Sequence, residues 1–240
     1  WHEDIMVFSG IINKFQMKFK DRQAAANILG ESLKNIIKNE ERKNSLVLGI
    51  PRGGVIIADI IGRKISCEFG VIIPRKLRAP HNKELAIGAV IGDGVTFVNE
   101  LIVKELEISQ DYIKEEKSRQ SEEIRRRTFL YCSGNRNFAD CSSIPFDNKT
   151  VILADDGVAT GATIIAAARW LRSTKHLRHL LIVVPIIPND TLNILKNEDV
   201  DHIEVITSPK LNFRSIEQYY HNFEQITDNE VIGIIDRNRR

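Results

Sequence analysis

The sequence has few cysteines and no long apolar run, and both absences exclude classes of protein. Its three cysteines, Cys67, Cys132 and Cys141, include no Cys-x-x-Cys pair, so neither a disulfide framework nor a zinc site is predicted. Apolar runs such as Leu180–Ile187 are far shorter than the roughly 20 residues that cross a bilayer. The first residues, Trp1 to Asp4, lack the charge pattern of a signal peptide. We therefore expect a cytoplasmic protein that makes no contact with a membrane.

Excess charge and internal repetition are absent as well. The formal net charge is +2 and the isoelectric point is about 8.4, which is too close to neutral to predict a nucleic-acid partner. The sequence is 42% hydrophobic and 28% charged, as in ordinary globular proteins. It shows no low-complexity tract and no repeat of roughly 20–50 residues. We expect residues 1–18 to be peripheral and residues 19–240 to form one domain.

What the sequence does contain is an alternation of short apolar runs and helically spaced segments. From residue 21 to 38, apolar residues recur at the three-to-four spacing of an amphipathic helix. Strands are predicted at residues 45–50, 69–73, 85–91, 95–98, 150–154, 180–185 and 202–207, and further helices at 55–65, 100–127, 162–171 and 191–196. The strands at 85–91 and 95–98 should pair as a hairpin. The other elements predict an α/β fold, in which helices cover both faces of a parallel sheet of about five strands.

Three polar segments follow predicted strands: Pro51–Gly54, Arg75–Lys83 and Asp155–Thr163. Ligands of parallel α/β sheets bind at the carboxyl ends of the strands, so we expect these segments to converge at one edge. The second segment is rich in proline and basic residues and is predicted to be a long loop.

The third segment carries the most specific pattern. Four apolar residues precede Asp155 and Asp156 at a strand end, and Gly161 then permits a tight turn into a helix. Backbone N–H groups at the start of that helix, with the hydroxyl groups of Thr160 and Thr163, would bind an anion. The segment thus offers donors for a phosphate and acceptors for hydroxyl groups, which a sugar phosphate requires. The alternative is a solvated strand end followed by an ordinary helix cap.

This pattern resembles the signature of the type I phosphoribosyltransferase family: an apolar strand, two acidic residues and a Thr-Gly-x-Thr turn. In that family the acids hold the ribose hydroxyl groups of 5-phosphoribosyl-1-pyrophosphate (PRPP), and the turn binds its 5′-phosphate. The resemblance implies that Asp155 and Asp156 act on the ribose during catalysis. It assigns the 5′-phosphate to Ala159, Thr160, Gly161, Ala162 and Thr163.

Two further segments resemble parts of the same family's site. Arg52, Gly53 and Gly54 resemble its pyrophosphate loop, and the alternative for this segment is an ordinary Gly-Gly turn. Arg75 and Lys76 resemble the basic pair that the adenine and orotate enzymes place against the pyrophosphate. Adjacent cations fit a leaving group that carries several negative charges.

The segment Leu77–Glu84 resembles the flexible catalytic loop that closes over the substrate in this family. From it, Arg78, His81 and Lys83 would either reach the substrate on closure or form a solvated surface.

The resemblance extends over most of the chain, toward a branch of the family that occurs alone or fused to hydrolase-like domains. The matching stretches are Phe19–Arg22, Pro51–Val55, Arg75–Leu77, Asn82–Val90, Asp155–Thr163 and Pro209–Val231. The resemblance implies a transferase that passes phosphoribose from PRPP to a nucleobase-like small molecule and releases pyrophosphate. Mg²⁺ would be bound through the hydroxyl groups and pyrophosphate of PRPP, near Asp155 and Asp156. A homodimer is compatible with this interpretation.

A regulatory protein that binds PRPP or a nucleotide without turnover is the alternative. Such proteins often lose the closing loop or its basic residues, whereas Arg75, Lys76, Arg78 and Lys83 are all present here. A PRPP synthase shares the phosphate loop but normally contains a repeated domain, and no such repeat is visible.

The acceptor is predicted less directly. A small hood over the base is expected from about residues 208–224, where Phe213, Tyr219, Tyr220 and Phe223 could stack on a ring or anchor the segment to the core. At the position of Ala159, the enzymes for 6-oxopurines carry an aspartate that exchanges a proton with the purine N7. Alanine has no proton to exchange, so hypoxanthine and guanine are expected to be poor acceptors.

Overall fold

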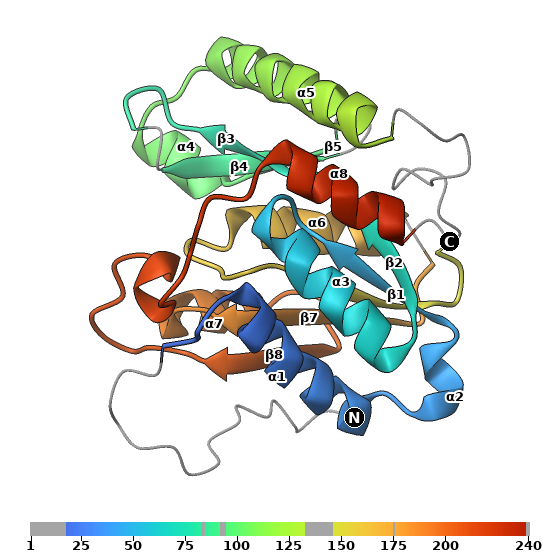
Figure 1. The fold of residues 1–240 in the computed structure, drawn as a ribbon. Coiled ribbons are helices and arrows are strands. Elements are labelled where there is room, and N and C mark those ends of the chain that lie inside the picture. Colours follow the sequence, from blue (N-terminus) through green and yellow to red (C-terminus); the bar gives the residue numbers. More distant parts are fainter. Residues whose placement is uncertain (1–17, 83–84, 92–94, 133–145, 175, 239–240) are drawn as a thin grey trace.

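The computed structural model describes residues 18–82, 85–91, 95–132, 146–174 and 176–238. Its centre is a five-stranded sheet in the order β2-β1-β6-β7-β8, and every pairing in it is parallel (Figure 1). The strands are β1 (Ser45–Gly49), β2 (Glu68–Val71), β6 (Thr150–Ala154), β7 (His179–Ile186) and β8 (His202–Thr207). The predicted α/β fold with a parallel five-stranded sheet is confirmed.

Helices cover both faces of this sheet. On one side lie α1 (Arg22–Ile36) and α3 (Gly53–Ile65), with the short α2 (Asn39–Arg42) between them in sequence; on the other lie α6 (Ala162–Thr174) and α7 (Asn189–Leu195) (Figure 1). Successive strand residues point to opposite faces. In β6, Val151 and Leu153 pack in the cluster that contains α6, whereas Ile152 packs in the cluster that contains α1 and α3. This explains why the strands appear in the sequence as continuous apolar runs.

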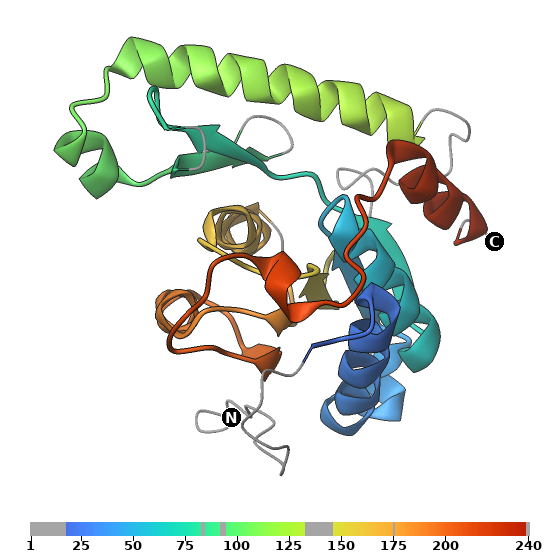
Figure 2. The same ribbon diagram turned by 60° about the vertical axis from the view of Figure 1, so that its left-hand side comes forward.

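A second sheet stands apart from the first and is antiparallel. It consists of β3 (Arg75–Arg78), β4 (Ala86–Ile91) and β5 (Val95–Val98), in that order. The predicted hairpin is therefore confirmed as β4 and β5. Figure 2 shows α5 (Gln110–Cys132) running along the outer side of this sheet, while α6 lies on the inner side. Leu77, Ile87 and Ile113 belong to the apolar cluster that joins this sheet to α5.

The prediction of a long loop over Arg75–Lys83 is wrong in its first part, because Arg75–Arg78 forms β3. In these four residues the alternation of buried and exposed side chains that marks a strand is seen only at the last two, where Leu77 is fully buried and Arg78 is exposed. That pattern is too short to be recognised beside two prolines. The strand exists because β4 provides backbone partners from Ala86 to Val90.

The single helix predicted at residues 100–127 is divided into α4 (Glu100–Glu105) and α5. Glu107 adopts a left-handed backbone conformation, with φ of 52°, which ends the first helix. The hydroxyl oxygen of Ser109 then accepts a hydrogen bond from the N–H of Tyr112 at 3.2 Å and begins the second. These local signals divide the helix, although the helical periodicity of the charged stretch continues through the break.

Residues 208–224 lead from β8 back to the start of α1. They contain a short 3₁₀ helix, η1 (Ile216–Tyr219), and Phe19 forms a parallel bridge with Tyr220. A Cβ atom added to Gly157 would lie 2.5 Å from Ile216 Cγ2, so this segment packs directly on the loop that follows β6.

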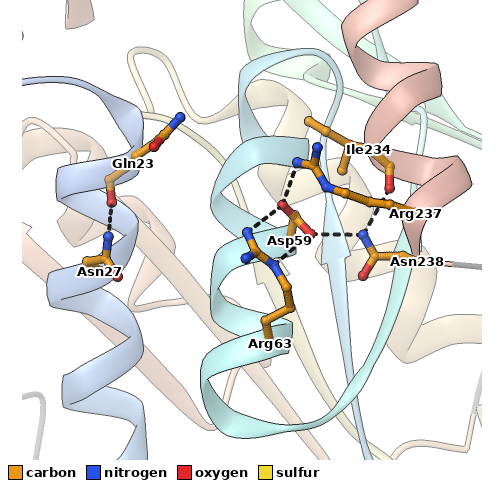
Figure 3. Close-up of polar contacts among 7 residues, drawn as sticks. All are labelled: Gln23, Asn27, Asp59, Arg63, Ile234, Arg237 and Asn238. Carbon is orange, nitrogen blue, oxygen red and sulfur yellow. Dashed lines mark hydrogen bonds and ion pairs between the residues drawn. The ribbon is translucent and has the colours of Figure 1, made fainter.

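A last helix, α8 (Asp228–Arg237), was not predicted. Its end is attached to α3 through Asp59, a side chain only 1% exposed. Figure 3 shows Arg237 and Asn238 converging with Arg63 on that carboxylate. The helix therefore covers α3 with its apolar side and holds it with a polar contact at its end.

Candidate functional site

Two loops meet at the carboxyl ends of the neighbouring strands β1 and β6. Gly49 at the end of β1 is aligned with Ala154 at the end of β6, and the N–H of Ile50 donates to the carbonyl of Ala154 at 2.9 Å. A helix begins after each loop, α3 at Gly53 and α6 at Ala162. Because the first N–H groups of a helix have no partner within it, two partial positive charges lie at this edge of the sheet.

The first of these loops lies in contact with the acidic residues of the second. A Cβ atom at Gly53 would lie 1.8 Å from Asp156 Oδ2, and one at Gly54 would lie 2.8 Å from Asp155 Cα. Side chains are therefore excluded at both glycines. The preceding peptide bond, Pro51–Arg52, is cis. The structure thus brings together the two segments that the sequence predicted to bind the pyrophosphate and the ribose.

The two carboxylates have different surroundings. Asp155 Oδ1 accepts a hydrogen bond from the backbone N–H of Asp156 at 2.9 Å, whereas Asp156 Oδ2 accepts one from Arg22 Nε at 2.6 Å. Burial raises the pKa of the Asp155 carboxyl well above its ordinary value, and the negative charge of Asp156 raises it further, while the positive charge of Lys76 acts in the opposite direction. Hydroxyl donors or a cation at this pair would stabilise its ionised form.

The turn into α6 contains a glycine in a left-handed conformation. Gly161 has φ of 79°, in the left-handed region that favours glycine. Before it, the carbonyl of Ala159 accepts a hydrogen bond from the hydroxyl of Thr191 at 2.7 Å, which fixes the turn to α7. Thr160 is exposed and Thr163 is half-buried. The side chains of these two threonines at the start of α6 therefore lie outside the core.

The predicted basic pair lies on β3, with Arg75 and Lys76 both half-buried. Arg75 Nε donates to Gln120 Oε1 of α5 at 3.1 Å. Burial lowers the pKa of Arg75, and the charge of Arg127 lowers it further. Lys76 lies close enough to Asp155 for its charge to lower the pKa of that carboxyl. The positive charge of Lys76 therefore acts on the acidic pair.

The three residues predicted to lie in a flexible loop do not share one structural setting. Arg78 belongs to β3, where its N–H donates to Glu116 Oε1 at 3.1 Å and its carbonyl accepts from the Tyr112 hydroxyl at 2.9 Å. Its assignment to a flexible loop is wrong, because both of its backbone groups are bonded to α5. His81 is exposed in the turn after β3. Lys83 lies outside the described residues.

Sequence reasoning missed Arg22, which is the direct partner of Asp156. Its side chain is 9% exposed, its Nη1 donates to the carbonyl of Glu224 at 2.9 Å, and its Cζ lies 3.7 Å from the ring centroid of Phe223. The stretch Phe19–Arg22 resembled the family, but nothing in the local sequence indicated that this arginine would reach a residue so far along the chain.

The aromatic residues of segment 208–224 mainly contact one another. Tyr219 and Tyr220 are buried, and Phe213 stacks on Tyr219 with ring centroids 6.1 Å apart. Phe223 stacks on Tyr220 with ring centroids 4.8 Å apart, and the Arg22 guanidinium lies over the Phe223 ring in a cation–π contact. Anchoring to the core, one of the two roles expected for these rings, is thus what the contacts show.

The described residues contain neither a candidate metal cluster nor a helix that could cross a membrane. No cluster of three or more His, Cys, Asp or Glu side chains in that part of the chain has an arrangement that could hold a metal ion. None of its helices combines the length and apolar character needed to cross a membrane.

Comparison with known proteins gives consistent matches. A family described as the phosphoribosyl transferase domain matches residues 16–223. A protein of Mycobacterium tuberculosis (strain ATCC 25618 / H37Rv), named "Putative phosphoribosyl transferase Rv0571c", is 31% identical over 222 residues, which are 92% of this chain and 47% of that protein. The chain therefore spans about half the length of the curated relatives that it matches.

A solved structure is similar over nearly its whole length. The crystal structure of TT1426 from Thermus thermophilus superposes with a TM-score of 0.74 at 30% sequence identity, covering 91% of this chain and 98% of that one. Together with the family match over residues 16–223, the paired acids at the end of β6 and the glycine turn into α6 show that this chain belongs to the phosphoribosyl transferase domain family.

Proposed function

We propose that this chain binds PRPP with Mg²⁺ and transfers its phosphoribosyl group to a nucleobase-like acceptor, releasing pyrophosphate. The observation that carries the proposal is the position of Asp155 and Asp156. They stand at the end of β6, between the amino-terminal ends of α3 and α6, with Asp156 against Gly53 and Asp155 against Gly54. Acceptors for hydroxyl groups thus lie between two sets of donors for phosphates.

Each group of site residues would bind a different part of PRPP. Asp155 and Asp156 would accept hydrogen bonds from the ribose hydroxyl groups, and the turn Ala159–Thr163 would bind the 5′-phosphate. The pyrophosphate would lie against Gly53 and Gly54, with positive charge supplied by Arg52, Arg75 and Lys76. The half-buried position of these cations supports this role, because charges act more strongly where water is partly excluded.

The residues present fit a magnesium ion held mainly by the substrate. Mg²⁺ is usually bound by one or two carboxylates together with phosphate oxygens and water, and two adjacent carboxylates lie beside the proposed pyrophosphate loop. When bound, the ion supplies positive charge against the pyrophosphate.

Catalysis would depend on electrostatics. The bond between ribose C1 and the pyrophosphate oxygen breaks, and a bond from the acceptor nucleophile to C1 forms. As the first bond lengthens, positive charge develops on the ribose, which the carboxylates favour. Negative charge develops on the leaving group, which Arg52, Arg75 and Lys76 favour.

An acceptor screen tests the activity. Magnesium-dependent release of pyrophosphate from PRPP would be measured with adenine, guanine, hypoxanthine, uracil and orotate. Hypoxanthine and guanine should be poor acceptors, because Ala159 offers no proton for exchange with the purine N7 and such a role is worth about 10²–10⁴-fold in rate. PRPP binding without release for any base would instead favour the regulatory alternative. A clear preference for guanine or hypoxanthine would contradict the interpretation of Ala159.

A double substitution tests the site. Asp155→Asn with Asp156→Asn should weaken the binding of PRPP with Mg²⁺ in calorimetry, because each lost hydrogen bond to a charged acceptor costs about 1.5–3 kcal/mol. The matched control removes two exposed acids of α5 by Asp111→Asn and Glu115→Gln. Unchanged affinity in the folded Asp155/Asp156 variant would refute the assignment.

A further inference from the structure

Arg22 is held on three sides, and only one of its contacts is to the proposed catalytic pair. Its Nε donates to Asp156 Oδ2 at 2.6 Å, its Nη1 donates to the carbonyl of Glu224 at 2.9 Å, and its guanidinium lies over the ring of Phe223. The side chain is nearly buried, with 9% of its surface exposed. A planar guanidinium can make these contacts together, whereas a lysine ammonium cannot, because it lacks the fork and the flat face.

The pair of Arg22 and Asp156 lies against the pyrophosphate loop. A Cβ atom at Gly53 would lie 2.8 Å from Arg22 Nε as well as 1.8 Å from Asp156 Oδ2. The pair therefore occupies the space that a side chain at this position would take. Any shift of the Asp156 carboxylate has to move the guanidinium or break their hydrogen bond.

The same arginine connects the acid to segment 219–224, the end of the predicted hood. Phe223 and Glu224 are its partners there, and a second connection runs from the Tyr220 hydroxyl to the carbonyl of Asp156 at 2.7 Å. Phe223 also stacks on Tyr220. The residue that would hold the ribose and the segment predicted to cover the acceptor thus share one contact network.

We propose that Arg22 is a positioning residue that fixes Asp156 for the ribose hydroxyl groups and transmits occupancy of the sugar site to segment 219–224. The proposal rests on the proposed function, because it assumes that Asp156 binds the ribose. A ligand that orders Asp156 orders its partner, and the partner orders the segment that holds it. By linkage, an ordered segment then favours the ligand equally.

The experiment compares Arg22→Gln and Arg22→Lys with wild type and with the control Arg63→Gln. Arg63 is also paired with an aspartate, Asp59, but on the far part of α3 (Figure 3). The probe is PRPP with Mg²⁺. Two quantities are measured for each protein: the dissociation constant by calorimetry, and hydrogen exchange of the amides in segment 219–224 with and without the probe.

In wild type and in Arg63→Gln, the probe should slow exchange in segment 219–224. Arg22→Gln should weaken binding about tenfold or more, from the loss of a charge-assisted hydrogen bond, and the ligand-dependent protection should disappear. Arg22→Lys keeps the charge near Asp156 and should recover part of the affinity. It should not recover the protection, because it cannot reproduce the contacts with Phe223 and Glu224.

If wild type binds the probe without protection of segment 219–224, or if Arg22→Gln binds it more weakly and keeps the protection, the proposed link between the sugar site and that segment is wrong. If wild type does not bind the probe, the proposed function fails, and this inference fails with it. If wild type binds and Arg22→Gln binds equally or more tightly, Arg22 has no positioning role. If Arg22→Gln does not fold, Arg22→Lys decides alone: protection of segment 219–224 as in wild type would overturn the proposal.

Discussion

Asp155 is the residue of the site whose ionisation is most disfavoured by its surroundings. It is half-buried where β6 ends, and its nearest charged neighbour is another carboxylate. Burial and the charge of Asp156 both raise its pKa, and Lys76 only partly opposes them. Such a residue lowers the stability of the free protein at neutral pH. The cost is offset when hydroxyl donors or a cation bind.

The first prediction follows from the sign of this shift. The folded-state pKa of Asp155 lies above the ordinary value of 3.8, so its contribution to the free energy of unfolding becomes less favourable as pH rises from about 4 through the folded pKa. Asp155→Asn should therefore raise the free energy of unfolding at pH 7 by on the order of 1 kcal/mol, so that the variant unfolds at a higher urea concentration than wild type. The difference in free energy should shrink toward pH 4. Equal destabilisation by this substitution at both pH values would contradict the assignment.

Among the elements, α5 determines the position of β3. Glu116 is fully buried and accepts hydrogen bonds from Gln120 at 2.9 Å and from the N–H of Arg78 at 3.1 Å. It also pairs with Arg119. Gln120 in turn holds the guanidinium of Arg75. One buried carboxylate on a helix therefore organises the strand that carries the proposed basic pair.

The second prediction concerns this carboxylate. Glu116→Ala leaves the N–H of Arg78 and the amide of Gln120 without their acceptor, which should lower the free energy of unfolding by about 1–3 kcal/mol. Amide exchange in β3 should become faster. Glu116→Gln keeps a hydrogen-bond acceptor at the same place and should lower the free energy of unfolding by less. Urea unfolding and hydrogen exchange measure both effects, and wild-type stability and β3 exchange in Glu116→Ala would show that the carboxylate is not needed to hold β3.

At the scale of the whole molecule, α8 joins parts that belong to different sheets. At its start, Asp228 accepts a hydrogen bond from the Tyr131 hydroxyl of α5 at 2.7 Å. At its end, Arg237 and Asn238 each donate to Asp59 of α3 at 2.8 Å (Figure 3). Helix α3 begins at the proposed pyrophosphate loop, and α5 holds β3. Thus α8 helps to set the position of the second sheet relative to the first.

The third prediction is that Arg237→Ala with Asn238→Ala destabilises the fold by about 1–3 kcal/mol at pH 7, because among the described residues the buried Asp59 then keeps only Arg63 as a side-chain partner. Burial alone would raise the pKa of Asp59, but hydrogen bonds from Arg237, Asn238 and Arg63 outweigh it and lower the pKa below the ordinary value of 3.8. The stabilisation should therefore be present above this value and disappear as pH falls through the folded pKa.

Urea unfolding at several pH values measures the effect of this double substitution. The control is Lys34→Ala, which removes an exposed pair with Glu31 and should change stability by less than about 1 kcal/mol. An effect of the double substitution as small as that of the control would mean that the polar contacts with Asp59 do not help to hold α8.

The sequence by itself determined the elements whose signals are local. The strands at 150–154 and 202–207 begin and end as predicted, because both are short stretches rich in β-branched apolar residues. The hairpin of β4 and β5 was found for the same kind of reason. The loop Asp155–Thr163 could be singled out because its acids, glycine and hydroxyl groups are adjacent in the chain.

Only the tertiary structure decided the rest, because the physical cause lies far away in the sequence. Arg22 meets Asp156 across 134 residues, and Arg237 meets Asp59 across 178, so no local pattern identifies either pair. The strand β3 is too short to bury more than Leu77 and depends on β4 and α5 for its backbone partners. Local chemistry thus identified the candidate site, and long-range packing determined which side chains support it.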